Sequence, residues 1–104
     1  MRLLVADDHP LFRLGLKAAL EAEGLEVVAE AGTGEEALVQ ALEKAPDAVL
    51  LDLRMPGMDG LTLAREAKRL RPGLAIVCCT GFGDARAERT AAEIGVAAFI
   101  RKPI

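Results

Sequence analysis

The sequence of 104 residues contains no tryptophan or tyrosine and only three phenylalanines. Single-stranded nucleic acids are commonly bound by stacking bases on aromatic side chains, so the sequence does not favour such a platform. It also has no excess of positive charge, because 13 Lys and Arg stand against 16 Asp and Glu. A net charge of −3 argues against a broad nucleic-acid footprint. We therefore expect no direct nucleic-acid binding by this segment.

Cysteines and long apolar runs are scarce as well. The only two cysteines, Cys78 and Cys79, are adjacent, and that spacing suits neither a disulfide framework nor a zinc site. The longest apolar run, Leu74–Cys79, is strand-sized, whereas a membrane span needs about 18 residues. Acidic residues follow Met1–Leu4 at once, which argues against a signal peptide. We expect a cytoplasmic protein that does not enter a membrane.

The 52% of hydrophobic residues are arranged in short runs that alternate with helical patterns. The runs begin at residues 3, 26, 48, 74 and 96, which are 23, 22, 26 and 22 residues apart. They are Leu3–Ala6, Glu26–Ala29, Ala48–Leu51, Leu74–Cys79 and Val96–Ile100. Strands that are apolar throughout and alternate with helices predict an α/β fold with one parallel sheet covered on both faces.

Each interval between these runs carries signals for one helix. Pro10 suits the start of the first helix and Gly24 its end, and Thr33 with Glu36 forms a capping box for the second. Asp59 can cap the third. The fourth, at Asp84–Ile94, is rich in alanine, so we expect it to be the least firmly anchored. The expected inward faces of the first three helices are Phe12, Leu16, Ala19 and Leu20; Ala37, Leu38, Ala41 and Leu42; and Leu63, Ala64, Ala67 and Leu70.

Four of the predicted strands run into residue types that can carry chemistry. These residues are Asp7–Asp8, Asp52, Thr80–Gly81 and Lys102–Pro103. In an open parallel sheet, ligands bind at the carboxyl ends of the strands, so these groups should converge on one cleft. Each feature alone has a structural explanation as a turn, a cap or an exposed residue. Their occurrence together at one sheet edge favours a functional site.

The chemistry of such a cleft follows from its charges. Three carboxylates close together repel one another, and a divalent cation removes the conflict. Oxygen ligands favour Mg²⁺ or Mn²⁺ over zinc. A metal and a lysine beside a carboxylate can neutralise a phosphate and let the carboxylate approach phosphorus. Thr80 and the Gly81 N–H could bind phosphoryl oxygens. Phosphoryl transfer is the reaction that these residue types indicate.

The same residues carry a family resemblance that covers essentially the whole chain. They are Val5-Ala6-Asp7-Asp8, the run from Leu50 to Gly60, Thr80-Gly81, and Phe99 with Lys102-Pro103. The chain resembles the receiver domain of bacterial two-component response regulators. The resemblance implies a flavodoxin-like, doubly wound, five-stranded parallel sheet of order 2-1-3-4-5. The segment Asp8-His9-Pro10-Leu11-Phe12 resembles the subfamily whose output is a helix-turn-helix DNA-binding domain.

The resemblance also implies a role for each site residue. Asp52 would accept a phosphoryl group from the phosphohistidine of a sensor histidine kinase, and Lys102 would pair with the acceptor, aimed by a cis bond to Pro103. Magnesium, or Mn²⁺, would be held by Asp8 directly, Asp7 largely through water, Asp52, and the backbone carbonyl of Arg54. Such a protein catalyses its own phosphorylation and dephosphorylation but is not otherwise an enzyme.

Further residues would transmit or limit the signal. By the same resemblance, Thr80 would move toward the phosphate and Phe99 would turn inward, repacking the surface of the fourth helix and fifth strand. Gly81 stands where alanine is frequent and should keep phosphate access open. Arg54 and Phe82 flank the site, and we predict that they slow hydrolysis by limiting water access. His9 is interpreted as a residue at the start of the first helix rather than a phosphodonor or ligand.

Other functions fit the residues less well. A phosphatase of the haloacid dehalogenase type needs a second Asp two residues after the nucleophile, where this chain has Arg54. A flavin or nucleotide module would need a loop rich in Gly, Ser or Thr after the first strand. A pseudo-receiver would usually lack Asp52, Thr80 or Lys102. The output stays open between a transcription regulator and a stand-alone receiver acting through an effector protein.

A receiver normally has a fifth helix that shares one sheet face with the first. This sequence has patterns for five strands and four helices and stops at Ile104. We therefore expect residues 1–104 to be a C-terminally truncated receiver domain with no output domain. Apolar surface left open on that face would cost several kcal/mol at about 25 cal/mol per Å². A chain of this length would then self-associate, as a homodimer or by swapping around the fourth-helix face.

Overall fold

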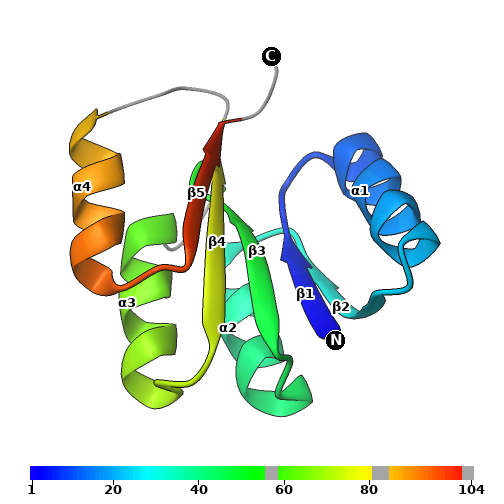
Figure 1. Cartoon of the computed structure of the whole chain (residues 1–104), viewed down its shortest axis with the longest axis horizontal. Coiled ribbons are helices and arrows are strands. Elements are labelled where there is room, and N and C mark those ends of the chain that lie inside the picture. The colour runs from blue at the N-terminus through cyan, green and yellow to red at the C-terminus, as the bar shows by residue number, and fades with distance from the viewer. Residues whose placement is uncertain (56–58, 81–84, 102–104) are drawn as a thin grey trace.

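Five parallel strands form the centre of the molecule in a computed structural model that describes residues 1–55, 59–80 and 85–101 (Figure 1). The sheet order β2-β1-β3-β4-β5 confirms the expected order 2-1-3-4-5 and the flavodoxin-like α/β fold. The elements are β1 (Arg2–Ala6), α1 (Pro10–Ala22), β2 (Glu26–Ala31), α2 (Gly34–Lys44), β3 (Ala48–Asp52), α3 (Gly60–Leu70), β4 (Ala75–Thr80), α4 (Ala85–Ile94) and β5 (Ala98–Arg101).

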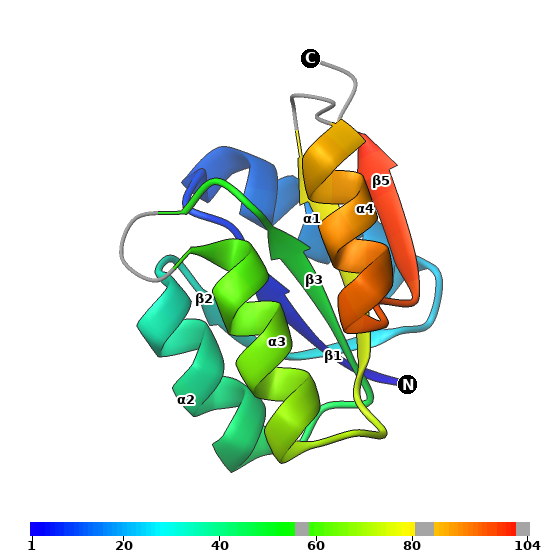
Figure 2. The same ribbon diagram turned by 90° about the vertical axis from the view of Figure 1, so that its left-hand side faces the viewer.

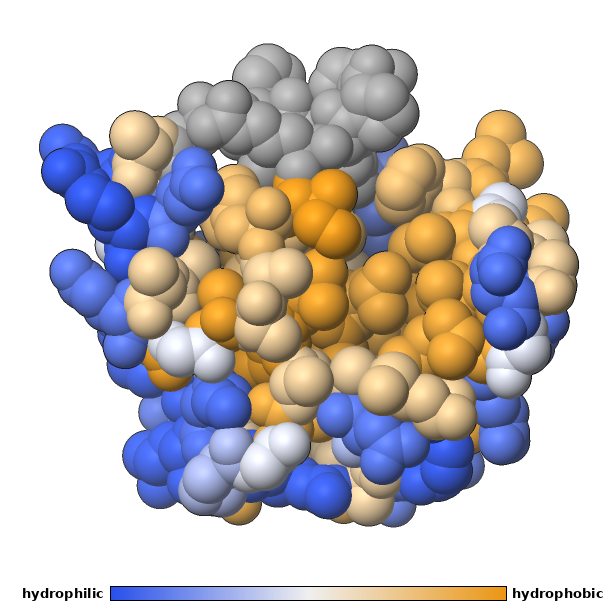
Figure 3. Space-filling model, in the orientation of Figure 1, coloured by the Kyte–Doolittle hydropathy of each residue, from blue (hydrophilic) through white to orange (hydrophobic). Residues whose placement is uncertain are grey.

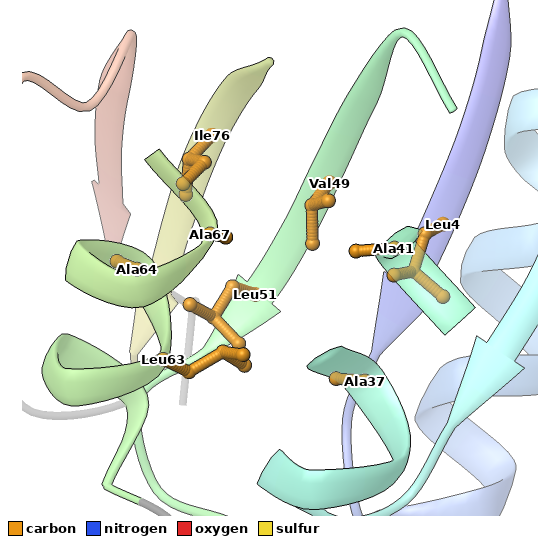
Figure 4. Close-up of a pocket in the computed structure, with 9 residues that line it drawn as sticks. All are labelled: Leu4, Ala37, Ala41, Val49, Leu51, Leu63, Ala64, Ala67 and Ile76. Atoms are coloured by element: carbon orange, nitrogen blue, oxygen red, sulfur yellow. The ribbon is translucent and has the colours of Figure 1, made fainter. Parts of the chain in front are cut away.

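The helices are divided unequally between the two faces of the sheet. Figures 1 and 2 show α1 alone on one face and α2, α3 and α4 on the other. The main core lies under the group of three helices, where Leu4, Leu51 and Ile76 are buried against α2 and α3 (Figure 4). The helices meet the sheet there largely through alanines, which allow a close approach. A small pocket at this contact has an entirely apolar lining, so we assign no ligand to it.

Helix ends follow the signals in the sequence. The Thr33 side chain accepts a hydrogen bond from the Glu36 backbone N–H at 3.2 Å, and Asp59 accepts one from the Leu61 N–H at 3.2 Å. These bonds satisfy backbone donors that have no partner inside the helix. Gly24 follows α1 with φ +85°, and Gly95 follows α4 with φ +94°. Only glycine adopts this conformation without strain, so both helices end where the sequence predicts.

Three positions on the expected inward faces are instead exposed. Leu42 and Leu70, near the ends of α2 and α3, are 46% and 43% exposed, and Ala19 in α1 is also exposed. Periodicity identifies the face of a helix, but not how far that face reaches beyond the sheet that covers it. The two leucines lie near the C-terminal ends of their helices, while Leu63 and Ala64 nearer the start of α3 are buried.

The sheet face that carries α1 is only partly covered. No residue of α1 is buried, and Ile100 on β5 is 50% exposed. Leu50, Val77 and Ala98 lie side by side on β3, β4 and β5, and none of them is buried. Figure 3 shows apolar side chains gathered across this view, over the strands between α1 and α4. Four helices are present in the described residues, and apolar residues on the α1 side of the sheet are partly exposed among them.

The adjacent cysteines point to opposite faces of the sheet, as expected for neighbours in a strand. Cys78 is fully buried in the main core, whereas Cys79 is half-buried and lines a small pocket with Phe12 and Leu16 of α1. Burial raises the pKa of the Cys78 thiol to about 11. None of the described helices has the length and apolar character that a bilayer span requires.

Candidate functional site

Three aspartates meet at the carboxyl edge of the sheet. Asp7 and Asp8 follow β1, and Asp52 is the last residue of β3. The two strands are adjacent and parallel, with Ala6 paired to Leu51, so their ends lie together. Ligand atoms of Asp7, Asp8, Asp52 and also His9 all lie within 4.8 Å of one another. The predicted convergence of the three carboxylates is therefore present.

Two of these carboxylates are buried. Asp7 and Asp52 are each 3% exposed, and they are the only buried polar or charged residues among those described. Burying a carboxylate is costly unless it has hydrogen bonds or a cation nearby. Asp7 Oδ1 accepts the His9 backbone N–H at 2.8 Å, and Asp52 Oδ1 accepts the Arg54 backbone N–H at 2.9 Å. Each carboxylate is thus oriented by the N–H two residues later.

The third carboxylate shows why a cation fits this group. Asp8 Oδ1 is buried and makes no hydrogen bond of good geometry within the described residues, and its one close nitrogen there is His9 Nδ1 at 3.1 Å. A buried oxygen that accepts no hydrogen bond is expected where a metal supplies the missing interaction. Oxygens from three carboxylates are the ligands that Mg²⁺ and Mn²⁺ prefer. The residues at this edge therefore fit a divalent cation.

The loop after β3 is held by close packing around Leu53. The Leu53 N–H donates to the Cys79 carbonyl at 3.1 Å, and Met55 is buried. A Cβ added at Gly60 would lie 2.7 Å from the Leu53 Cα, so only glycine allows α3 to start here without moving the loop. Arg54 is exposed, and its predicted role in limiting water access stays a prediction.

The loop after β1 is held by Arg13, which sequence reasoning did not identify. Its Nη1 donates to the Asp7 carbonyl at 2.6 Å and to the Ala31 carbonyl at 3.5 Å, and its Nε donates to Glu30 Oε1 at 3.2 Å. One side chain thus ties the loop after β1 to the end of β2. The only signal in the sequence is an arginine one turn into the first helix.

His9 belongs to the site as well as to the helix. It is the N-cap of α1, which confirms the expected place at the start of the helix, but its side chain makes no cap bond. The ring nitrogen Nδ1 instead lies 2.9 Å from Asp7 Oδ1 and 3.1 Å from Asp8 Oδ1. It is also 3.6 Å from Asp52 Oδ2. The Nδ1 atom of the imidazole therefore lies within 3.6 Å of a carboxylate oxygen of each of the three aspartates.

The remaining candidate residues lie at the same edge or outside the described residues. Thr80 is the last residue of β4 and pairs with Arg101 of β5. The residue before it, Cys79, pairs with Asp52 of β3. Phe99 is half-buried and packs against the main core. Gly81, Phe82, Lys102 and Pro103 lie outside the described residues, so their predicted roles stay predictions.

Comparison with known proteins identifies the family to which this chain belongs. The family model for the response regulator receiver domain matches residues 3–104 of this chain. The chain belongs to this family. Like the receiver domain of the response regulator NarL from Mycobacterium tuberculosis, it has the two-component receiver fold, with a TM-score of 0.93 at 36% identity. That alignment covers 99% of this chain and 84% of the other.

Two receiver relatives differ in how much of their length this chain spans. Chemotaxis protein CheY of Bacillus subtilis is 37% identical over 102 residues, which are 98% of this chain and 85% of that protein. Transcriptional regulatory protein PdtaR of M. tuberculosis is 39% identical over 104 residues. That match covers 98% of this chain but only 49% of PdtaR, so the chain spans about half of that regulator.

Proposed function

We propose that this receiver domain, residues 1–104, is a phosphorylation-controlled switch whose phosphoacceptor is Asp52. The observation that carries the proposal is the buried carboxylate of Asp52, 3% exposed and held within 4.8 Å of the Asp7 and Asp8 ligand atoms. The donor is the phosphohistidine of a sensor histidine kinase. An Asp52 oxygen bonds to phosphorus as the phosphorus–nitrogen bond breaks, and the electron pair returns to the imidazole, which takes up a proton.

The chain holds the acceptor in place for this step. The Arg54 N–H fixes one oxygen of Asp52 at 2.9 Å, which limits rotation of the carboxylate. Arg13 Nη1 donates to the Asp7 backbone carbonyl at 2.6 Å, which holds the backbone that carries Asp7 and Asp8. Asp8, Asp7, Asp52 and the Arg54 carbonyl would hold Mg²⁺ or Mn²⁺, which neutralises phosphoryl charge when bound. Lys102 would pair with the acceptor and then the phosphoryl group.

The switch would act through the least anchored part of the fold. Ala91 is the only buried residue of α4 among those described, so little apolar burial holds this helix. Phe99 on the neighbouring strand β5 is already half-buried against the core. We propose that Thr80 follows the phosphate and Phe99 turns inward, which changes the α4–β5 surface. A sensor kinase and an output domain or effector would read the two states.

Two kinds of output are compatible with this receiver domain. We favour control of transcription, supported by the likeness to PdtaR, which is named a transcriptional regulatory protein. The output domain would be of the helix-turn-helix type that the segment from Asp8 to Phe12 resembles. The alternative is a stand-alone receiver that acts on an effector protein, supported by the 85% of CheY that the chain spans. In either case we propose a cytoplasmic location, which suits two free cysteines, and homodimer formation as one readout.

Phosphotransfer is tested by incubating the protein with acetyl phosphate and Mg²⁺ and measuring its intact mass. We expect a gain of one phosphoryl group that disappears with EDTA and in Asp52→Asn. Asp59→Asn is the matched control, because within the described residues the Asp59 side chain caps α3, and asparagine leaves an amide able to cap. An unchanged mass, or a gain that persists in Asp52→Asn, would refute the assignment.

A further inference from the structure

His9 has a position that its place at the helix start does not require. Its backbone is fixed on both sides, because its N–H donates to Asp7 Oδ1 at 2.8 Å and its carbonyl accepts the Arg13 N–H at 2.9 Å. The side chain is 63% exposed, so packing does not force the ring toward the acids. The ring nevertheless brings Nδ1 to 2.9, 3.1 and 3.6 Å from carboxylate oxygens of three aspartates.

These distances resemble those between ligands of one metal ion. Ligands at adjacent corners of an octahedron with bonds of about 2.1 Å are about 3.0 Å apart. The separations of 2.9 and 3.1 Å from His9 Nδ1 to Asp7 and Asp8 match that spacing. The contact of 2.9 Å between Nδ1 and Asp7 Oδ1 also has hydrogen-bond length, and Asp52 Oδ2 lies farther from the ring at 3.6 Å.

We propose that His9 Nδ1 is an additional ligand of the cation site and sets its metal preference. Imidazole nitrogen suits Co²⁺, Ni²⁺ and Zn²⁺, whereas Mg²⁺ strongly prefers oxygen. The exposed ring turns away when Mg²⁺ binds and stays when Co²⁺ binds. A metal bound at Nδ1 takes the ring tautomer that carries its proton on Nε2. This inference rests on the metal site of the proposed function.

The test measures Co²⁺ and Mg²⁺ binding by titration calorimetry on the native chain, His9→Asn and Asp8→Asn. Asparagine is a good N-cap residue, so His9→Asn preserves the helix start. We expect His9→Asn to weaken Co²⁺ binding about 10-fold or more, the scale on which groups supporting a metal site act. Mg²⁺ affinity should change less than about twofold. Asp8→Asn should weaken both ions.

A second readout uses the fact that His9 is the only histidine in the chain. Its ring protons give one set of NMR signals. Zn²⁺ should shift them as it binds the ring, whereas Mg²⁺ should move them toward the positions of an imidazole in water, because the ring then leaves the acids. Equal Co²⁺ affinity for the native chain and His9→Asn would overturn the proposal. So would tighter Mg²⁺ binding in His9→Asn, because the ring would then block the site. A thiolate–Co²⁺ absorption band would assign the softer ligand to Cys79 instead, which lines a pocket with Asp52.

The two proposals fail in different ways. If the native chain binds neither Mg²⁺ nor Co²⁺, the cation site itself is wrong, and the proposed function loses its metal. If Mg²⁺ binds and Asp8→Asn abolishes that binding while His9→Asn changes nothing, only the role of His9 is wrong. A thermal melt of each variant shows whether the fold is retained, and a 63% exposed side chain should not affect it.

Discussion

Substituting Gly60 with alanine should disturb both the fold and the phosphoacceptor. The added Cβ would lie 2.7 Å from the Leu53 Cα, 0.7 Å below the 3.4 Å at which ordinary van der Waals contact begins. It would also lie 3.2 Å from the Leu53 carbonyl oxygen, so backbone rather than a flexible side chain must move. Overpacking of this kind costs about 1–3 kcal/mol, and the lower chain entropy of alanine recovers about 0.4–1 kcal/mol.

The expected net loss in the free energy of unfolding is therefore about 1–2 kcal/mol. For a domain of this size that lowers Tm by roughly 5 °C for each kcal/mol. Because Leu53 lies between Asp52 and the Arg54 N–H that orients it, phosphorylation by acetyl phosphate should also slow, by about 10-fold. Thermal denaturation followed by circular dichroism gives the first quantity, and intact mass against time gives the second.

Gly73→Ala is the matched control, because a Cβ there meets no atom within 4 Å and the backbone is not left-handed. It should leave Tm unchanged or raise it slightly, with normal phosphorylation. Equal stability of the two variants would refute the close packing of Gly60 on Leu53. A destabilised Gly60→Ala that is phosphorylated at the native rate would refute the link between this packing and the acceptor.

Three more predictions address other parts of the molecule. Because burial raises the Cys78 pKa from its ordinary 9.0 to about 11, Cys78 should react with iodoacetamide at pH 8 much more slowly than half-buried Cys79, and equal reactivity would contradict the burial. The unfolded chain releases the Cys78 proton at lower pH than the folded chain, so the free energy of unfolding should fall between pH 9 and 11. At high concentration, light scattering should give the 104-residue chain a mass above its 11.0 kDa monomer mass, and Ile100→Lys should reduce this association. A monomer mass at every concentration would argue against pairing through the open face. Replacing Arg54 and Phe82 together with small polar residues should shorten the aspartyl-phosphate lifetime, and an unchanged lifetime would remove their role in limiting water.

The fold and the acid cluster were predictable because they depend on the order of elements. Apolar runs at regular spacing indicate a parallel sheet, in which the strand ends share one edge. The family resemblance implies the order that sets the first and third strands side by side, so Asp7, Asp8 and Asp52 were expected to meet. The limits of single elements were less predictable. The second strand was expected to end at Ala29 but continues to Ala31, because pairing with Ala6 extends it.

What the sequence could not reveal depends on side-chain contacts between distant elements. Arg13 reaches the carbonyls of Asp7 and Ala31, and nothing local to the first helix indicates that geometry. His9 likewise has an exposed ring, and nothing local to the helix start indicates that Nδ1 lies 2.9 and 3.1 Å from Asp7 and Asp8. Leu42 and Leu70 match the helical period yet remain exposed, because the extent of burial is a property of the packed molecule.

The most direct test of the account is to locate the phosphoryl group in the chain. After reaction with acetyl phosphate and Mg²⁺, borohydride reduces an aspartyl phosphate to homoserine, which peptide mass spectrometry can place at one residue. We expect homoserine at position 52 only, and none when EDTA is present. Homoserine at position 7, 8 or 59, or at no position, would contradict the assignment of Asp52 as the phosphoacceptor.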